Sequence, residues 1–268
     1  DLKFENTEVW GFEHALRGMR NPKNSWNKSD SKFNDYYDIT RGDVPSYELL
    51  KYCPSAYIHH KNDNGYYVDI IGEADMKLAQ SLIKAGSEHR KFMRQIFVSV
   101  DITAPLYWWK EFDTYKVGTT ANSTSTMHKL ATTPITLDCF EMDDYEEYCN
   151  FHSDFLGEDG LSADDCESMI FCQWIPLLEG LRKKYLDTKD KRYWKELIRW
   201  LPESWLQKRT VTMTYENLLA MCGKGQRRFH KLNEWSGQDN SNVPNFIISW
   251  ARSLPYAQEL IFIDELEN

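Results

Sequence analysis

The stretch at residues 102–130, ITAPLYWWKEFDTYKVGTTANSTSTMHKL, changes character halfway along its length. Its first part is apolar and helix-like, and its second part is built almost wholly of Thr, Ser, Asn and Gly. Small hydroxyl and amide side chains offer little apolar area to remove from water, so this run cannot form a core. Many short hydrogen-bonding groups in a row are typical of a loop that receives a polar ligand. The simpler interpretation is a surface turn after a helix.

The composition indicates a folded protein with a substantial core. The chain has 268 residues, of which 41% are hydrophobic and 14% aromatic, so disorder is not expected. The net charge of −9 and the isoelectric point near 5.3 argue against a protein that coats nucleic acid, because a duplex binder needs a basic face. Two or three Arg or Lys side chains still suffice to hold one phosphorylated small molecule.

The cysteines favour a reducing compartment. No two of the six form a CxxC pair, so a zinc ribbon is not expected, and a chain with this much core does not depend on disulfides. No apolar run is long enough to span a bilayer, and no signal-peptide pattern is present. We therefore expect a soluble, cytoplasmic protein with free thiols at Cys53, Cys139, Cys149, Cys166, Cys172 and Cys222.

The first hundred residues contain both helix and strand patterns. Residues 10–26 begin as an amphipathic helix that breaks at Asn21-Pro22, and residues 27–46 are polar and predict a loop. Residues 66–71, which follow the turn signal NDNG, predict a strand. Residues 74–85 have helical spacing, with Gly86 placed to end the helix.

The rest of the chain is mainly helical in pattern. Residues 92–102 alternate and predict a strand, and Pro105 suits the first turn of a helix that runs to Phe112. Leu201-Pro202 separates the later helices from residues 203–221, and no repeat or sharp change in composition marks a domain boundary. One α+β domain is the simplest account. It has a polar N-terminal segment at about 27–64, an inserted helical region at about 140–200, and helices at 143–156, 162–185, 190–200 and 244–266.

One basic cluster follows the glycines Gly223 and Gly225. It comprises Lys224, Gln226, Arg227, Arg228 and His230. The guanidinium group matches a phosphate, and glycines before a helix leave backbone N–H groups open to an anion. Adjacent arginines on a helix point about 100° apart, so one of the pair would face a pocket. A solvated helix start is the alternative.

His230 and Glu234 stand four residues apart and would share one face of a helix. Such a pair is compatible with a metal half-site, a structural hydrogen bond or an acid–base pair. No third ligand has a suitable spacing, and the adjacent His59 and His60 would point apart on extended backbone, so we expect no metal. The GxSxG, Walker and GxGxxG motifs are absent from the sequence.

Three separated segments together resemble the flavin-dependent thymidylate synthases, the ThyX family. Residues 75–86 and 92–112 are similar to that family's helix, strand and helix, with Ile102-Thr103-Ala104-Pro105 at its I-x-A-P turn. The signature RHRxxSxNExSxR survives in part as the N-x-x-S spacing of Asn122 and Ser125, and the Lys-Leu that follows it is kept as Lys129-Leu130. The third segment resembles the last conserved block through Leu201-Pro202, residues 212–219, Arg227, Arg228, His230 and Glu234.

The chain also departs from the family pattern. The Arg-His-Arg of the signature is replaced near residues 113–116, its Glu falls on Ser123, and its final Arg falls on Met127. After Gly86, the family's flavin-contacting His/Thr/Glu pattern is replaced by Ser87, Glu88, His89 and Met93. The resemblance covers residues 75–130 and 201–260 in family order, which is around half of the chain.

The resemblance implies a ThyX-like α+β domain with a small, mainly antiparallel sheet packed by helices, and a homotetramer with shared sites. It implies FAD as cofactor, and dUMP, methylenetetrahydrofolate and NADPH as substrates. Asn122 and Ser125 would be catalytic. Substrate would be bound by Ser123, Lys116, Arg227 and Arg228, and the cofactor by Ser87, His89, Thr214, His230 and Glu234. The alternatives are a nucleotide-binding protein of this fold without the reaction, and an enzyme that modifies another pyrimidine, such as a dCMP derivative.

Overall fold

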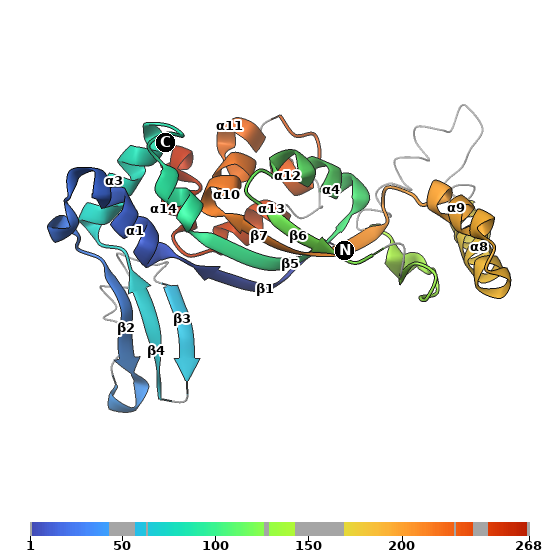
Figure 1. Ribbon diagram of the computed structural model, residues 1–268, viewed down its shortest axis with the longest axis horizontal. Coiled ribbons are helices and arrows are strands. Elements are labelled where there is room, and N and C mark those ends of the chain that lie inside the picture. The colour runs from blue at the N-terminus through green and yellow to red at the C-terminus, as the bar shows by residue number, and fades with distance from the viewer. Residues whose placement is uncertain are drawn as a thin grey trace. The chain divides into compact units, whose positions relative to one another are not determined.

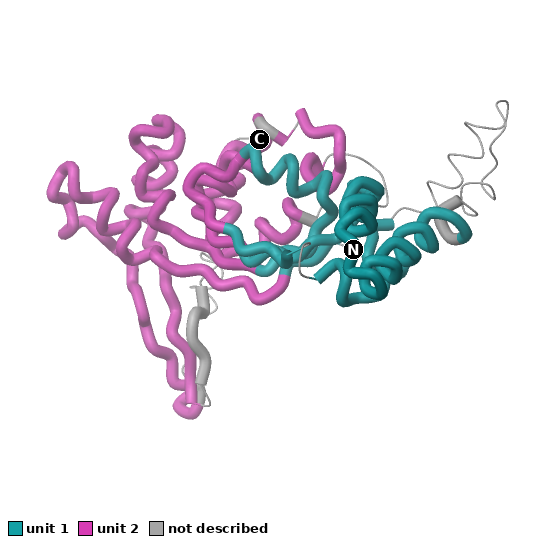
Figure 2. Tube along the Cα trace, turned by 45° about the vertical axis from the view of Figure 1, so that its right-hand side comes forward, with its two compact units in different colours: residues 1–4, 101–114, 121–210 teal, residues 5–100, 115–120, 211–268 magenta. Residues whose placement is uncertain are grey.

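The computed structural model of the chain combines helices with two small sheets (Figure 1). It describes residues 2–42, 57–62, 64–125, 129–142, 169–227, 229–237 and 246–266. Two compact units, coloured separately in Figure 2, are each assembled from several stretches of the chain. Unit 1 contains residues 1–4, 101–114 and 121–210, and unit 2 contains residues 5–100, 115–120 and 211–268.

One sheet has the strand order β1-β5-β7-β6. Its strands are β1 (Lys3–Trp10), β5 (Phe97–Pro105), β7 (Leu206–Thr214) and β6 (Thr120–Ser123). In β5, alternate residues from Val98 to Ala104 are buried, which confirms the alternation in the sequence. The strand starts later than expected, because residues 91–95 form a 3-10 helix, η4 (Lys91–Gln95), with Phe92 and Met93 in the core. Strand β1 was not predicted.

The polar run is not wholly a loop, so that prediction was wrong for residues 120–123. They form strand β6, all four of whose residues are exposed, and β6 neighbours β7 in the sheet. Backbone hydrogen bonding can hold a strand whose small side chains bury nothing. Just beyond the strand, the Thr124 amide donates to the Lys208 carbonyl over 2.8 Å.

A second, antiparallel sheet has the order β2-β4-β3, with strands β2 (Lys32–Asp38), β4 (Gly65–Ile70) and β3 (Tyr57–Asn62). Strand β4 confirms the prediction for residues 66–71. The loop predicted at 27–46 was wrong where β2 lies, because β2 is stabilised by partners distant in sequence. Tyr37 lies opposite Tyr66, and their rings stack at 5.7 Å, as cross-strand aromatic pairs do.

The N-terminal part of unit 2 contains two α-helices. Helix α1 (Phe12–Arg20) ends at the 3-10 turn η1 (Asn21–Lys23), as predicted. Helix α3 (Glu73–Lys84) also forms as predicted, and Gly86 follows it with φ 106°. A buried ion pair joins the two helices: Arg20 Nε lies 2.5 Å from Asp75 Oδ1. Short 3-10 turns η2 (Trp26–Lys28) and η3 (Ile39–Arg41) flank β2.

Unit 1 holds the helices that follow β5 and precede β7. Helix α4 (Leu106–Phe112) begins after Pro105, as predicted, and buries Trp108, Trp109 and Phe112. A π-helical turn, η7 (Met169–Trp174), leads into α8 (Ile175–Thr188), and α9 (Lys191–Trp200) follows. These elements confirm the helices predicted at 162–185, within its described part, and at 190–200. The helix predicted at 143–156 lies outside the described residues.

The C-terminal part of unit 2 is a set of short helices. They are α10 (Tyr215–Cys222), α11 (Lys224–Arg227), α12 (Asn233–Ser236), α13 (Phe246–Arg252), α14 (Ala257–Leu260) and the 3-10 turn η8 (Ile263–Glu265). The single helix predicted at 244–266 was therefore wrong. It is interrupted around Pro255 and Tyr256, where Tyr256 has φ 54°, a left-handed conformation that an α-helix cannot contain. In the part of the chain that the structure describes, no helix is long and apolar enough to cross a membrane.

Candidate functional site

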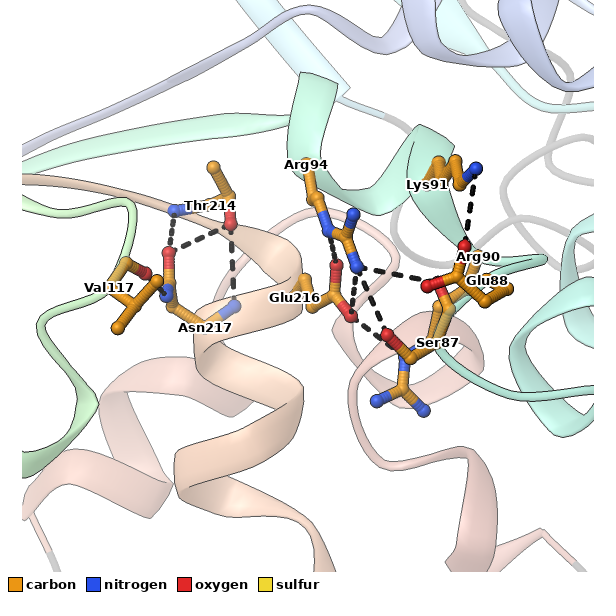
Figure 3. Close-up of polar contacts among 9 residues, drawn as sticks. All are labelled: Ser87, Glu88, Arg90, Lys91, Arg94, Val117, Thr214, Glu216 and Asn217. Carbon is orange, nitrogen blue, oxygen red and sulfur yellow. Dashed lines mark hydrogen bonds and ion pairs between the residues drawn. The ribbon is translucent and has the colours of Figure 1, made fainter.

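Polar side chains cap helix α10 where it follows strand β7 in unit 2. Thr214 is the N-cap of α10, and its hydroxyl accepts a hydrogen bond from the Asn217 amide over 3.3 Å (Figure 3). In return, the Asn217 side-chain oxygen accepts bonds from the Thr214 amide at 2.9 Å and hydroxyl at 2.8 Å. This reciprocal capping fixes where the helix begins. Thr214, expected to bind a cofactor, is 7% exposed and uses its hydroxyl within the cap.

Glu216, in the first turn of α10, accepts hydrogen bonds from two arginines of the segment that contains η4 (Figure 3). Arg90 Nε donates to Glu216 Oε1 over 3.1 Å, and Arg94 Nε donates to Oε2. Arg94 Nη2 also donates to the Ser87 hydroxyl over 3.1 Å. The hydrogen bond and the charge of Glu216 raise the pKa of Arg94 above its usual value. Two guanidinium groups thus share the Glu216 carboxylate, and the charge of Glu88 also acts on Arg94.

Arg90 keeps part of its hydrogen-bonding capacity unused. Its Nη1 and Nη2 atoms point away from Glu216 in Figure 3, and they make no hydrogen bond with any described residue. The side chain is 27% exposed, and the neighbouring Ser87 and His89 are exposed as well. Ser87 and His89 therefore lie beside Arg90 and Arg94, two arginines that the sequence did not indicate as site residues.

The first turn of α10 also forms a hydrogen bond with the segment that contains Lys116. Asn217 Nδ2 donates to the Val117 carbonyl over 2.8 Å. The Thr119 amide closes a turn onto the Lys116 carbonyl at 2.9 Å, with Gly118 at φ 81°. Lys116 itself is exposed. Its ammonium group is thus available to a ligand, on a segment fixed at Val117.

An aromatic cluster lies between the same segment and the start of α12. Tyr115 Oη is 3.1 Å from His230 Nε2, and the Tyr115 and Trp235 rings stack with centroids 5.9 Å apart. His230 precedes α12, and Leu232 is the N-cap of that helix. His230 and Glu234 therefore do not share a helix face, and that interpretation was wrong: the chain turns at 229–232 before the helix begins.

Arg227 ends the short helix α11 and is engaged within the protein. It forms an ion pair with Glu265, which Arg252 also contacts at 2.7 Å. Burial raises the pKa of Glu265, but the hydrogen bond from Arg252 and the charges of both arginines outweigh burial and leave that pKa below its usual value. Arg227 is 11% exposed. Arg228, the other candidate for a phosphate, lies outside the described residues.

The remaining candidates belong to unit 1. Asn122 and Ser123 lie on the exposed strand β6, and the Ser125 carbonyl accepts the Lys129 amide at 3.0 Å. Asp113, which stands where the signature begins, pairs with Arg209 over 3.1 Å. Among the described residues, no group of three or more His, Cys, Asp or Glu side chains is placed to hold a metal ion.

Sequence reasoning missed four residues of this arrangement. Arg90 and Arg94 lie 126 and 122 positions before Glu216, so no local pattern links either arginine to it. Asn217 had a readable signal, since a Thr three residues before a polar side chain at the end of a strand is a capping pattern.

Comparisons with known proteins identify the fold. No protein-family model matches the sequence, and no curated protein matches it. Among solved structures, the flavin-dependent thymidylate synthase ThyX from Helicobacter pylori, complexed with FAD and dUMP, matches 98% of this chain and 98% of its own with a TM-score of 0.54 and 12% identity. A second structure of ThyX from Helicobacter pylori, also with FAD and dUMP, covers 100% and 99% with a TM-score of 0.53 and 12% identity. A UMP/dUMP methylase, PolB from Streptomyces cacaoi, bound with 5-Br dUMP, covers 97% and 94% at 0.47 and 11%.

The chain therefore has the α+β fold of the flavin-dependent thymidylate synthases. It is a divergent, ThyX-like version of that fold, since the match spans nearly the whole length of both chains at low identity. This result confirms the fold class expected from the sequence.

Proposed function

We propose that the protein is a ThyX-like enzyme that acts on a pyrimidine deoxynucleotide, with reductive methylation of dUMP to dTMP as its reaction. The observation that carries the proposal is the whole-chain match to two ThyX structures that contain FAD and dUMP. Methylenetetrahydrofolate would be the carbon donor and NADPH the reductant. The assembly would be a homotetramer with shared sites.

The residues at η4 fit an anionic cofactor such as FAD. Arg90 has two terminal nitrogens without a hydrogen-bond partner among the described residues, and the exposed Ser87 and His89 add donors beside it. Such groups suit the oxygens of a diphosphate. Bound FAD would supply hydride transfer. The protein's part is to hold the phosphates, with Glu216 fixing the direction of Arg90.

The nucleotide would be held by the remaining candidates. The exposed side chains of Asn122 and Ser123 and the half-buried Ser125 would hydrogen-bond the base, and the exposed Lys116 would contact the phosphate as a point charge. Arg227 already has Glu265 as a partner, but two arginines share that carboxylate. A phosphate would balance the extra positive charge. His230 and Glu234, by contrast, are proposed to contact the cofactor, with His230 positioned by Tyr115 in the aromatic cluster.

Two measurements test the enzyme proposal. The purified protein is expected to show flavin absorbance, or to acquire it when FAD is added. It is also expected to release tritium from dUMP labelled at C5 when the folate and NADPH are supplied. A protein that shows no affinity for FAD in a titration would refute the flavin assignment.

A second candidate is a nucleotide-binding protein of this fold that lacks the reaction. The pairing of Asp113 with Arg209 favours it, because an ion pair within the protein stands where the signature begins. Thermal-shift measurements with dUMP, dCMP, dTMP and folates separate the candidates, since a ligand that binds only the native state raises its apparent stability. Stabilisation by dUMP without tritium release supports the binding protein, whereas a preference for dCMP supports an enzyme for another pyrimidine.

A further inference from the structure

The negative charge of this protein is concentrated in one stretch of its sequence. Residues 143–168 contain ten Asp or Glu and no Lys or Arg, a net charge of −10. All other residues together contain 32 Lys or Arg and 31 Asp or Glu, a net of +1. The overall value of −9 therefore does not describe most of the molecule, and it cannot exclude a basic surface elsewhere.

The most basic segment is the helical hairpin of α8 and α9. Residues 181–200 carry eight Lys or Arg and three Asp or Glu, a net of +5. The two helices lie side by side in unit 1 (Figure 1) and are joined by Lys189 and Asp190. Of the eight basic side chains, only Arg182 is buried, against Glu179. The exposed seven are Lys183, Lys184, Lys189, Lys191, Arg192, Lys195 and Arg199.

Three of these cations form a stripe on α9. Arg192, Lys195 and Arg199 have the spacing of one helix face, and with Tyr193 and Glu196 they line a hollow of about 490 Å³. Lys195 and Arg199 are like charges four residues apart, as are Lys191 and Lys195. Such pairs destabilise a helix until an anion lies between them.

Among the described residues, few carboxylates compete for this stripe. The side chains of Lys184, Lys191 and Lys195 make no ion pair with any described residue. Arg192 pairs with Asp190 and Arg199 with Glu196, but the arginine side chains are 89% and 57% exposed. Exposed pairs of this kind contribute little to stability, so a phosphate can replace them at small cost.

Aromatic side chains accompany the cations. Tyr193 lines the same hollow, and Trp200, at the end of α9, is 48% exposed. A surface that carries cations with aromatic rings between them suits single-stranded nucleic acid, which has both phosphates and bases. At physiological salt, charges more than about 8 Å away are largely screened. The local charge of the hairpin therefore governs what it binds.

We propose that the α8–α9 hairpin is a binding surface for single-stranded nucleic acid, with phosphates on the α9 stripe and bases against Tyr193 and Trp200. An acidic peptide would satisfy the cations but not the rings, so nucleic acid is the better match. The surface is independent of the nucleotide site proposed above. Neither Lys191, Lys195 nor Arg199 is a residue of that site.

The test is fluorescence anisotropy with a labelled 20-nucleotide oligothymidylate and the full chain. We expect binding at 50 mM salt that weakens as salt rises, with a log–log slope of about −3.5 for roughly five phosphates. Joint substitution of Arg192→Glu, Lys195→Glu and Arg199→Glu should weaken binding by about 30-fold or more. The matched control, Lys3→Glu, Lys23→Glu and Lys28→Glu, makes the same change of charge at three other exposed lysines and should change affinity less than threefold.

Two additions keep the result unambiguous. Lys184→Gln, Lys191→Gln and Lys195→Gln remove charges that have no ion-pair partner in the described structure, and this variant should also lose affinity with an unchanged circular dichroism spectrum. A polyglutamate peptide of 20 residues should compete poorly. The proposal is overturned if the full chain does not bind at 50 mM salt, if the control triple weakens binding equally, or if polyglutamate competes as well as the oligonucleotide.

Discussion

Arg90 donates its Nε to Glu216 over 3.1 Å, and this contact leaves both Nη atoms of the guanidinium directed away from the carboxylate. The two residues come from different parts of the chain, 126 positions apart. Glu216 thus orients a cation that retains donors for an external anion. Arg94 differs, because its Nη2 is already occupied by Ser87.

The first prediction concerns Arg90. Arg90→Ala should weaken FAD binding by about 10- to 100-fold, since a hydrogen bond to a charged group is worth about 1.5–3 kcal/mol. Arg90→Lys should restore only part of the affinity, because a lysine lacks the planar fork. Quenching of flavin fluorescence on titration gives the dissociation constants. Lys91→Ala is the matched control: its side chain is 65% exposed and forms an ion pair with Glu88. Equal losses in both variants would contradict the assignment.

The second prediction separates two roles for Thr214. If its hydroxyl serves the helix cap, Thr214→Ala should lower the free energy of unfolding by about 1 kcal/mol, and Thr214→Ser should restore it. Urea denaturation followed by circular dichroism measures both. Asn217→Ala should produce a similar loss, because it removes the other half of the cap. A Thr214→Ala variant of unchanged stability that no longer binds FAD would instead show a cofactor contact.

The fold was predictable where neighbouring residues determine structure. Helix α3 was found because its apolar spacing and Gly86 lie within fourteen residues. Strands β2 and β6 were missed, since neither has an apolar face and each is stabilised by a strand far away in the sequence. The break in the helix at Tyr256 also involves residues far away in the sequence. The Tyr256 hydroxyl accepts a hydrogen bond from the Ile71 amide at 3.0 Å and donates one to the Asp69 carbonyl at 3.1 Å.

The candidate site also depends on contacts between residues that are distant in the sequence. Thr214 was singled out by the resemblance alone, because no strand end was predicted there and its capping pattern with Asn217 was overlooked. The pairing of Arg90 and Arg94 with Glu216 exists only after β5, β7 and α10 have formed. From the sequence alone, two arginines four residues apart predict a solvated surface, because the Glu216 carboxylate that both contact is distant in the sequence.

The third prediction concerns stability in acid. The hydrogen bonds from Arg182, opposed by burial and assisted by the Ile135 amide, lower the pKa of Glu179 from 4.5 to about 2. A carboxylate whose pKa is lower in the folded state stabilises the fold above its unfolded pKa, and this contribution is lost as the pH falls from about 4.5 to about 2. Glu179→Gln should therefore lower stability at pH 7 and flatten its decline between pH 4.5 and 2. Glu203→Gln, at an exposed pair with Lys110, should leave that decline unchanged in urea titrations.

The fourth prediction uses the cysteines to report on packing near Arg227. Cys222 is fully buried, and burial raises its pKa to about 12, a rise that the charges of Arg227 and Arg252 only partly oppose. At pH 8 about 0.01% of this thiol would be thiolate, and the thiolate is the reactive form. Iodoacetamide should therefore label the exposed Cys172 in the native protein and leave Cys222 unmodified, while guanidinium chloride should expose both to labelling. Peptide mass spectrometry reads each site separately. Native labelling of Cys222 at the rate of Cys172 would mean that α10 and the Arg227–Glu265 pair do not pack as described.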